Sequence, residues 1–268
     1  MVDRIITGAS RGIGRALVLA LSRDARPGDR IFALARDEAR LESLRPAVGP
    51  SLELHPVRVD LSRPDEAREV GERLASRVAV GSILVHNAGL WPSRRDLVDG
   101  REASYATNVV APLALQAPLL DRGVLGRILV IGAGILVKGR FDPSRTPVGE
   151  DFSAFRTYAT TKLAQAIAMR DVARRHPDVD LAVVHPGVVR TDLGARDGLV
   201  GWFLDRVKRR WESPEDCADR LVRILGRPRW QTRPGEAPWL VEDVERPWPA
   251  PVDRDSASVL RSLASDAG

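Results

Sequence analysis

The chain has 268 residues, of which 44% are hydrophobic and 29% are charged. That length fits one large domain or two small ones, and the balance is typical of a soluble globular protein with a sizeable core. Lys and Arg number 41 and Asp and Glu 36, which gives a net charge of +5. The densest basic cluster, Lys208-Arg209-Arg210, is too short for a nucleic-acid-binding arm, so we expect no nucleic-acid partner.

Cys217 is the only cysteine, which excludes an internal disulfide and a Cys-rich zinc site. No acidic cluster suggests a metal site either. No apolar run approaches the roughly 20 residues of a membrane span. No signal-peptide pattern precedes the first expected strand. We therefore expect a cytoplasmic protein without a metal.

Short apolar runs alternate with longer helix-like stretches along the first 185 residues. Most runs are rich in Ile, Val and Leu without alternation, which is typical of strands buried on both faces. We expect strands at residues 4–7, 30–35, 52–59, 82–86, 127–131 and 180–185. We expect helices near residues 13–23, 38–44, 64–76, 102–120 and 155–175. This order predicts an α/β fold, a doubly wound parallel sheet with helices on both faces, in a single domain over residues 1–268.

Two stretches fit this pattern less well. Residues 132–153 lack periodicity and contain Pro143 and Pro147, so we expect a long loop. Residues 228–256 carry six of the 19 prolines and three of the six tryptophans. We expect an irregular C-terminal extension at about 228–268, packed around aromatic anchors.

A glycine-rich turn joins the first expected strand to a helix, with the sequence Thr7-Gly8-Ala9-Ser10-Arg11-Gly12-Ile13-Gly14. Glycines permit a tight turn and let backbone N–H groups approach a pyrophosphate at the helix N-terminus. The spacing is Gly-x-x-x-Gly-x-Gly rather than the Gly-x-Gly-x-x-Gly of most dinucleotide-binding folds. At the first strand of a doubly wound sheet, this turn indicates a dinucleotide site.

Two more motifs follow: Asn87-Ala88-Gly89 after the fourth expected strand, and Tyr158-Ala159-Thr160-Thr161-Lys162 on a helix. In this order and context, the three motifs resemble those of the short-chain dehydrogenase/reductase family. The resemblance covers essentially the whole chain and implies a Rossmann-type fold that binds a nicotinamide cofactor. It also implies cofactor contacts from Asp60, Leu61, Asn87, Ala88, Gly89, Tyr158, Lys162, Pro186, Gly187, Val189 and Thr191, in addition to the glycine-rich turn.

Charge at the end of the second expected strand favours NADP(H). NAD-binding members of such folds place an acid there to hold the ribose 2′-hydroxyl, and an acid would repel a 2′-phosphate. Ala35 stands in the acid's position, Arg36 follows it, and Arg11 lies within the glycine-rich turn. Two guanidinium groups suit a phosphate dianion by charge and by bidentate geometry.

Tyr158 and Lys162 are four residues apart, so they share one face of a helix. A Tyr hydroxyl is almost wholly protonated at neutral pH, and a nearby ammonium favours its phenolate form. The resemblance implies that Tyr158 is the general acid/base and that Lys162 lowers the pKa of Tyr158 and binds the nicotinamide ribose. It also implies that Asn108 supports a proton-relay water.

One position departs from the family pattern. Relatives usually carry a Ser at the end of the fifth strand that hydrogen-bonds the substrate oxygen, and Ala133 aligns with it here. Loss of such a donor typically lowers the rate about 10²–10³-fold. Another hydroxyl could replace it, with Ser144, Ser153 and Thr157 nearby in sequence. Alternatively, the substrate does not need the donor, or the protein has left redox chemistry.

Two function hypotheses therefore stand. The first is an NADP(H)-dependent oxidoreductase that transfers a hydride between nicotinamide and a carbonyl or alcohol carbon of a small molecule. The alternative is a non-redox relative, either a cyclase or isomerase or an NADP-binding protein without turnover. The stretch 139–155 and the tail 249–263 resemble the retinol-dehydrogenase-like branch of the family. The resemblance implies a substrate lid at about 192–213, and the apolar, glycine-flanked stretch within it favours a hydrophobic or aromatic substrate. The alternative is an amphipathic helix packed on the core.

Surplus apolar residues on the helices at 102–120 and 155–175 lead us to expect a homodimer or homotetramer. Val109, Leu113, Leu115, Leu163, Ile167 and Met169 are among them. His86 and His185 end strands, and we expect them to be packed residues rather than ligands.

Overall fold

The computed structural model describes residues 2–190 and 211–266. Thr191 and nearly all of the expected lid at 192–213 lie outside the described residues. The main sheet has eight strands in the order β10-β9-β8-β7-β4-β1-β2-β3. All neighbouring pairs are parallel except β9 and β10, which are antiparallel. This arrangement confirms the predicted doubly wound α/β fold in a single domain.

The six expected strands are all present. They are β1 (Asp3–Thr7), β2 (Asp29–Ala35), β3 (Leu52–Arg58), β4 (Ser82–His86), β7 (Leu125–Ile131) and β8 (Asp180–His185). Successive residues of one strand enter different cores: Ile5 packs in one and Ile6 in the other. Apolar residues are therefore needed on both faces, which explains the continuous apolar runs.

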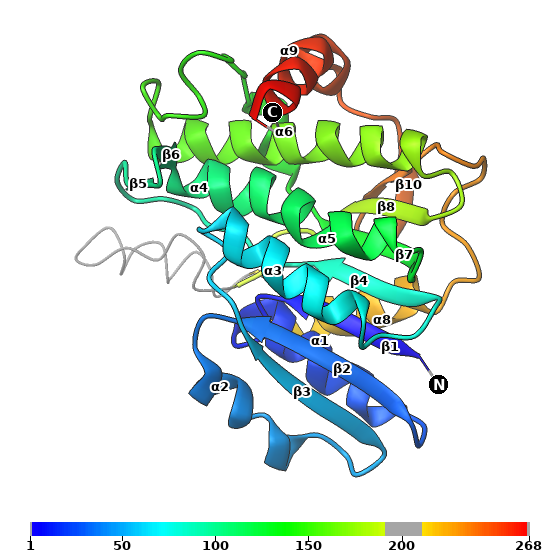
Figure 1. Cartoon of the computed structure of the whole chain (residues 1–268). Helices are drawn as coiled ribbons and strands as arrows, with labels where there is room; N and C mark the ends of the chain where they lie inside the picture. Colours follow the sequence, from blue (N-terminus) through cyan, green and yellow to red (C-terminus); the bar gives the residue numbers. More distant parts are fainter. Residues whose placement is uncertain (1, 191–210, 267–268) are drawn as a thin grey trace.

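Helices cover both faces of the sheet (Figure 1). The core on one face contains residues of α3 (Pro64–Ala75), α5 (Ala111–Asp121), α6 (Ala154–Arg175) and α9 (Ala250–Asp266). The core on the other face contains residues of α1 (Gly12–Arg23), α2 (Glu38–Glu42) and α8 (Pro214–Leu225). Because β1, β2, β4, β7 and β8 are parallel, their carboxyl ends meet at one edge of the sheet.

The expected helix at 102–120 is composite. A one-turn helix α4 (Ala103–Tyr105) leads into a π-helical turn η2 (Ala106–Val110), and α5 follows. A small hairpin of β5 (Leu97–Val98) and β6 (Arg101–Glu102) precedes it. Within the expected loop 132–153, the first residues form a 3₁₀-helix η3 (Gly134–Lys138). Another 3₁₀ turn, η1 (Arg45–Ala47), follows α2.

The prediction of an irregular C-terminal extension is wrong. Residues 228–268 contain β9 (Trp239–Val241), β10 (Val244–Arg246) and the long helix α9. Prolines at 249 and 251 flank the first residue of α9, where a missing backbone N–H breaks no helical hydrogen bond. Those prolines mark a helix start rather than irregular chain. Helix α8 was also not predicted, although Ser213 caps it by accepting a hydrogen bond from the Asp216 N–H.

Helix α9 lies against α6, where Arg170 pairs with Asp253 at 2.7 Å. Nearly all the apolar residues that suggested self-association are buried within the chain itself, with Leu163 and Met169 of α6 fully so. Self-association stays a prediction. The surplus apolar residues that led to it are not exposed on these helices.

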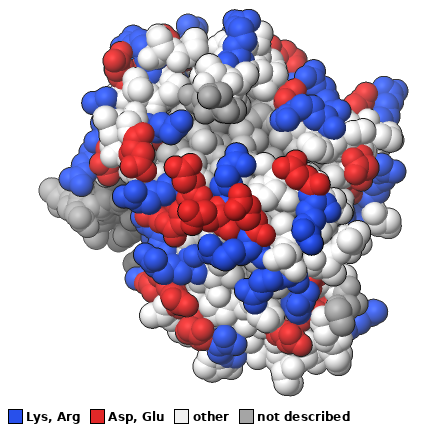
Figure 2. All heavy atoms as spheres, viewed as in Figure 1, with Lys and Arg blue, Asp and Glu red and all other residues white. Residues whose placement is uncertain are grey.

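Charges of both signs are interspersed on the face seen in Figure 2, where basic and acidic side chains lie next to one another. Among the described helices, none is both long and apolar enough to cross a membrane.

Candidate active site

A cavity of about 610 Å³ opens at the carboxyl ends of the parallel strands. Its size is in the range of small-molecule and cofactor sites. The predicted site residues that line it are Gly8, Ser10, Arg11, Gly12, Ile13, Arg36, Asp60, Leu61, Asn87, Ala88, Gly89, Tyr158, Lys162, Pro186, Gly187 and Val189. Gly14 and Asn108 do not line it. In the described part of the chain, no group of three or more His, Cys, Asp or Glu residues could hold a metal ion.

The glycine-rich turn is close-packed as well as tightly bent. Gly8 adopts a φ of +67°, which L-residues rarely take, and a Cβ there would lie 2.9 Å from the Ala88 Cα. A Cβ at Gly14 would lie 2.3 Å from the Gly8 carbonyl oxygen. Gly14 therefore serves the packing of the turn against α1, while Gly8 and Gly12 line the cavity.

Hydrogen bonds join the turn to the Asn87-Ala88-Gly89 motif. The Asn87 side-chain amide donates to the carbonyl oxygens of Thr7 at 2.9 Å and Gly8 at 3.3 Å. In return, the Thr7 hydroxyl accepts from the backbone N–H groups of Asn87 and Ala88. Two motifs 80 residues apart thus form one rigid wall.

The other end of the cavity is basic. Arg11, Arg36 and Arg40 line it beside Ala35 and Asp37. Arg40, which was not predicted as a site residue, lies on α2 about one turn beyond Arg36. The Asp37 carboxylate is already occupied: it accepts from the Arg40 backbone N–H and pairs with the Arg40 side chain at 3.0 Å. That pairing partly neutralises the charge of Asp37 beside Arg36.

Tyr158 and Lys162 lie on the buried face of α6, and both line the cavity. The Lys162 ammonium donates to the Ile131 carbonyl and to the Gln165 Oε1, each at 2.9 Å. Burial lowers the pKa of Lys162 to about 7. Gln165, absent from the predicted site, therefore helps to hold this side chain.

Burial raises the pKa of Tyr158 well above its ordinary value. The expectation that Lys162 lowers the pKa of Tyr158 does not hold in this structure. The reason is geometric, since the ammonium is turned toward Ile131 and Gln165, and its own burial favours the neutral amine. Tyr158 is therefore protonated at neutral pH, as any Tyr is, and burial alone makes it a weaker acid than a free Tyr.

An unpredicted aromatic residue covers Tyr158. The Trp91 ring stacks on the Tyr158 ring with centroids 4.6 Å apart and planes 7° apart. Phe155 packs against the edge of Trp91 at 6.3 Å. Trp91 follows the Asn87-Ala88-Gly89 motif along the chain, so one loop supplies both cavity wall and cover.

Asn108 sits behind the cavity in the π-helical turn, fully buried. Its Oδ1 accepts from the Leu90 N–H at 2.7 Å, and its Nδ2 donates to the Leu90 carbonyl and the Thr161 hydroxyl. The side chain thus ties the loop before Trp91 to α6.

The two strand-end histidines differ. His86 is buried, its Nε2 lies 2.9 Å from the Gln116 Oε1, and burial lowers its pKa to about 4, as expected of a packed residue. His185 is only half-buried and lines the cavity with Ala133 and Tyr158. For His185, the expectation of a merely packed residue misses this exposure to the site.

Known proteins share these features. Residues 4–198 match the model of the family described as short chain dehydrogenase. The chain is 34% identical over 230 residues to a Streptomyces sp. (strain C5) protein assigned as a daunorubicin C-13 ketoreductase, covering 84% of this chain and 78% of that one. It is 28% identical to human retinol dehydrogenase 13 over 74% of this chain and 62% of that one.

Among solved structures, an alcohol dehydrogenase from the archaeon Thermococcus sibiricus, complexed with 5-hydroxy-NADP, superposes with a TM-score of 0.64. The two chains are 26% identical, and the match covers 92% of this chain and 99% of the other. The family profile spans most of the chain, and its motifs converge on one cavity. This chain therefore belongs to the short-chain dehydrogenase/reductase family and shares its hydride-transfer oxidoreductase character.

Proposed function

We propose that the protein is an NADPH-dependent reductase of hydrophobic or aromatic carbonyl compounds, with Tyr158 as the general acid. The observation that carries this proposal is the position of Tyr158 in the wall of the cavity that begins at the glycine-rich turn. Carbonyl reduction needs a proton donor at the substrate oxygen, and a Tyr hydroxyl is protonated at neutral pH.

The residues present fit a nicotinamide dinucleotide. The glycines leave backbone exposed at the N-terminus of α1, where Cβ atoms at Gly8 and Gly14 would collide with neighbouring backbone. At the far end, Arg11 and Arg36 would hold a 2′-phosphate, with Arg40 held beside them by Asp37. Asp60, Ala88 and Val189 would contact the rest of the cofactor, and Thr191 is assigned to it by family resemblance only.

When bound, the cofactor supplies a hydride from its nicotinamide ring. Tyr158 donates its proton to the carbonyl oxygen as negative charge develops there. Lys162, held by Gln165 and the Ile131 carbonyl, lines the same cavity and would contact the cofactor. Trp91 excludes water from one face of Tyr158. Asn108 holds the Trp91 loop in place.

The substrate class follows from the lining and from the relatives. Leu90, Val98, Ile131 and Ala133 contribute apolar surface to the cavity lining. The relative assigned as a daunorubicin C-13 ketoreductase suggests aromatic ketones as first probes. We keep a cytoplasmic location and self-association as predictions.

The test is stoichiometry. Wild-type protein, NADPH and a panel of aryl ketones that includes daunorubicin would be mixed, and NADPH oxidation compared with alcohol formed, mole for mole. We expect equal amounts. Product formed without NADPH oxidation would instead support the non-redox alternative, which is motivated by Ala133 in place of the family's Ser. NADH in place of NADPH is the control for cofactor preference.

A further inference from the structure

The cavity has no hydroxyl where the family's substrate-binding Ser would stand. Ala133 lies two residues beyond β7, at the N-cap of η3, in an extended conformation, and lines the cavity with only a methyl group. The hydroxyls proposed as substitutes do not line it. Ser144 is exposed and donates to the Asp142 carboxylate at 2.7 Å. Thr157 is buried and accepts from the Ser153 N–H at 3.0 Å. A donor that replaces this Ser would therefore come from another element.

His185 ends the neighbouring strand β8 at the same edge of the sheet. In the register of β7 and β8, Ile131 pairs with Val184, so His185 lies level with Gly132, directly before Ala133. The imidazole extends over the next residue of that loop: a Cβ on Gly134 would lie 2.7 Å from the His185 Nε2. Only glycine at 134 leaves room for the ring at this place.

The His185 ring is held by packing but forms no side-chain hydrogen bond within the described part of the chain. Trp239 stacks on it with planes 9° apart and centroids 6.4 Å apart. The His185 Nδ1 is buried without a hydrogen-bond partner, and no side-chain hydrogen bond of a described residue holds either ring nitrogen. The Nε2 is not among the fully buried unpaired atoms and forms no hydrogen bond with a described residue, so it is the ring nitrogen left open on a residue that lines the cavity. Because buried polar groups are nearly always paired, a half-buried imidazole with neither nitrogen paired fits a ligand-facing group.

The imidazole is neutral near pH 7. Burial lowers the pKa of His185. Two charged groups from the packed elements act on it in opposite directions: Glu242, between β9 and β10, raises its pKa, and Arg220 of α8 lowers it. A neutral imidazole still carries one N–H, and the tautomer protonated on Nε2 presents it beside Gly134.

We propose that His185 is a catalytic residue that donates an Nε2–H hydrogen bond to the substrate carbonyl oxygen, in the role that Ala133 cannot fill. This inference rests on the proposed reductase function. The bond polarises the carbonyl and stabilises the developing alkoxide. His185 keeps its proton throughout, Tyr158 transfers the proton that ends on the alcohol oxygen, and NADPH is the reductant.

The test uses His185→Leu, which removes the donor, and His185→Gln, which keeps an N–H near the same place. We expect His185→Leu to lower kcat about 10²–10³-fold, with NADPH affinity and thermal unfolding close to wild type. His185→Gln should retain a large part of kcat. His176→Leu, at the far end of α6, is the matched control and should leave kcat unchanged.

Rescue identifies the role. Ala133→Ser should restore most of the activity to His185→Leu but change the wild type little, because the two donors serve one oxygen. Equal effects of Ala133→Ser in both backgrounds would overturn the inference, as would full activity in His185→Leu. If His185→Leu fails to fold, Gly134→Ala provides a second route, since its methyl group displaces the ring and should lower kcat.

A spectroscopic readout separates this inference from the proposed function. ¹⁵N spectra of the four histidines, with His185→Leu for assignment, would be recorded with NADP⁺ and with acetophenone added. A shift of the His185 ring nitrogens on ketone binding is expected. An unchanged His185 signal on saturation refutes the donor role even where NADPH oxidation succeeds. A wild type that oxidises no NADPH but shows the shift would refute the reductase while keeping His185 as the carbonyl-binding donor.

Discussion

Polar side chains at the two ends of the parallel sheet differ in how they are paired. At the amino end, strands begin with carboxylates that are paired with arginines: Asp3 with Arg30, Asp29 with Arg4, and Asp180 with Arg127. At the carboxyl end, Tyr158 faces the cavity, and the Trp91 Nε1, the Gln165 Nε2 and the His185 Nδ1 are buried without hydrogen-bond partners.

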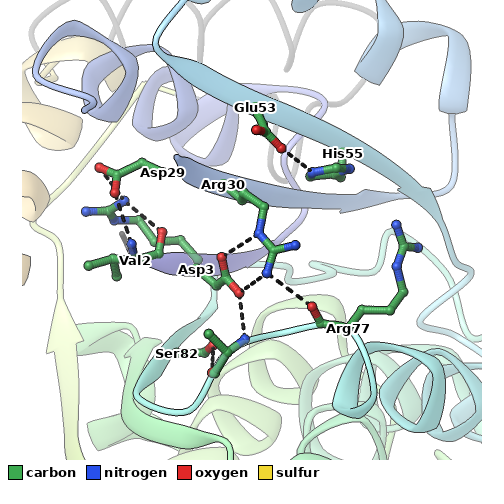
Figure 3. Close-up of polar contacts among 10 residues, drawn as sticks. Val2, Asp3, Asp29, Arg30, Glu53, His55, Arg77 and Ser82 are labelled. Atoms are coloured by element: carbon green, nitrogen blue, oxygen red, sulfur yellow. Dashed lines mark hydrogen bonds and ion pairs between the residues drawn. The ribbon is translucent and has the colours of Figure 1, made fainter. Parts of the chain in front are cut away.

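Asp3 illustrates the amino end (Figure 3). Its carboxylate accepts from the Arg30 Nε at 2.8 Å and Nη2 at 2.5 Å, and from the Ala79 N–H at 2.7 Å. Arg30 also donates to the Arg77 carbonyl, so one ion pair joins β1, β2 and the turn before β4. The carboxylates at this end are paired and hold strands in register, although the Arg127 Nη2 is buried without a hydrogen-bond partner. At the other end, Tyr158, Lys162 and His185 line the cavity.

The largest expected effect concerns catalysis at the carboxyl end. Tyr158→Phe removes only a hydroxyl and keeps the ring stacked on Trp91. General acid catalysis typically contributes 10²–10⁴-fold, so kcat should fall by about that factor while NADPH affinity stays within about twofold. Steady-state kinetics and fluorescence titration measure both. Retained turnover would mean that another group donates the proton.

At the amino end, the same kind of change should affect stability alone. Asp3→Ala leaves Arg30 without its partner and should lower the free energy of unfolding by about 3 kcal/mol, with kcat unchanged. Asp253→Ala breaks an exposed pair with Arg170 and should cost less than about 1 kcal/mol. Urea denaturation of both variants makes the comparison. A loss of kcat in Asp3→Ala would contradict the expectation that changes at the amino end affect stability and not catalysis.

Acid should act on the same group. Burial works to raise the pKa of Asp3, but the hydrogen bonds from Arg30 and Ala79 outweigh it and hold that pKa below its usual value. The unfolded chain thus binds the proton first. The stability contributed by Asp3 is present above about pH 4 and is lost as the pH falls through the lower folded pKa.

Spacing and the order of motifs along the chain predicted the residues that belong to short, contiguous motifs. The glycine-rich turn, the Asn87 motif and the Tyr158–Lys162 pair all reach the cavity as expected. The places of Trp91, Gln165 and His185 in the site could not be predicted from spacing, because they depend on side-chain contacts that only the folded structure shows. No sequence pattern marks a residue whose ring will stack on another or whose nitrogen will lack a partner.

The C-terminal errors have a different origin. Ser213 followed by Pro214 and two acids is a helix start, and prolines at 249 and 251 mark another. Both patterns were readable. High proline content was instead interpreted as irregular chain, although proline at the first turn of a helix favours it.

A smaller effect is expected at the basic end of the cavity. Arg36→Ala should weaken NADPH binding about tenfold, equal to about 1.4 kcal/mol, while leaving NADH binding nearly unchanged. Arg15→Ala on α1 outside the cavity is the matched control for lost positive charge. Calorimetric titration of both cofactors distinguishes the two outcomes. Equal weakening of NADPH and NADH by Arg36→Ala would place its contact away from the 2′-phosphate.

The smallest expected effect is on the pH dependence of the free energy of unfolding, through Lys162. Lys162 has a pKa of about 7 when folded, because it is buried, against about 10.4 in an unfolded chain. Between these values the unfolded chain binds more protons, so Lys162 makes the free energy of unfolding rise with pH, by at most about 1.4 kcal/mol per unit.

Lys162→Met removes this titration. From pH 7.5 to 8.5, its gain in stability should be smaller than that of wild type by about 1 kcal/mol, whereas exposed Lys138→Met should match wild type. Leaving Gln165 and the Ile131 carbonyl without the ammonium shifts stability equally at both pH values, so the slope isolates the proton. Identical slopes would mean that Lys162 stays charged when folded. The carboxyl end would then hold an ammonium satisfied by its neighbours, as the amino end holds Asp3.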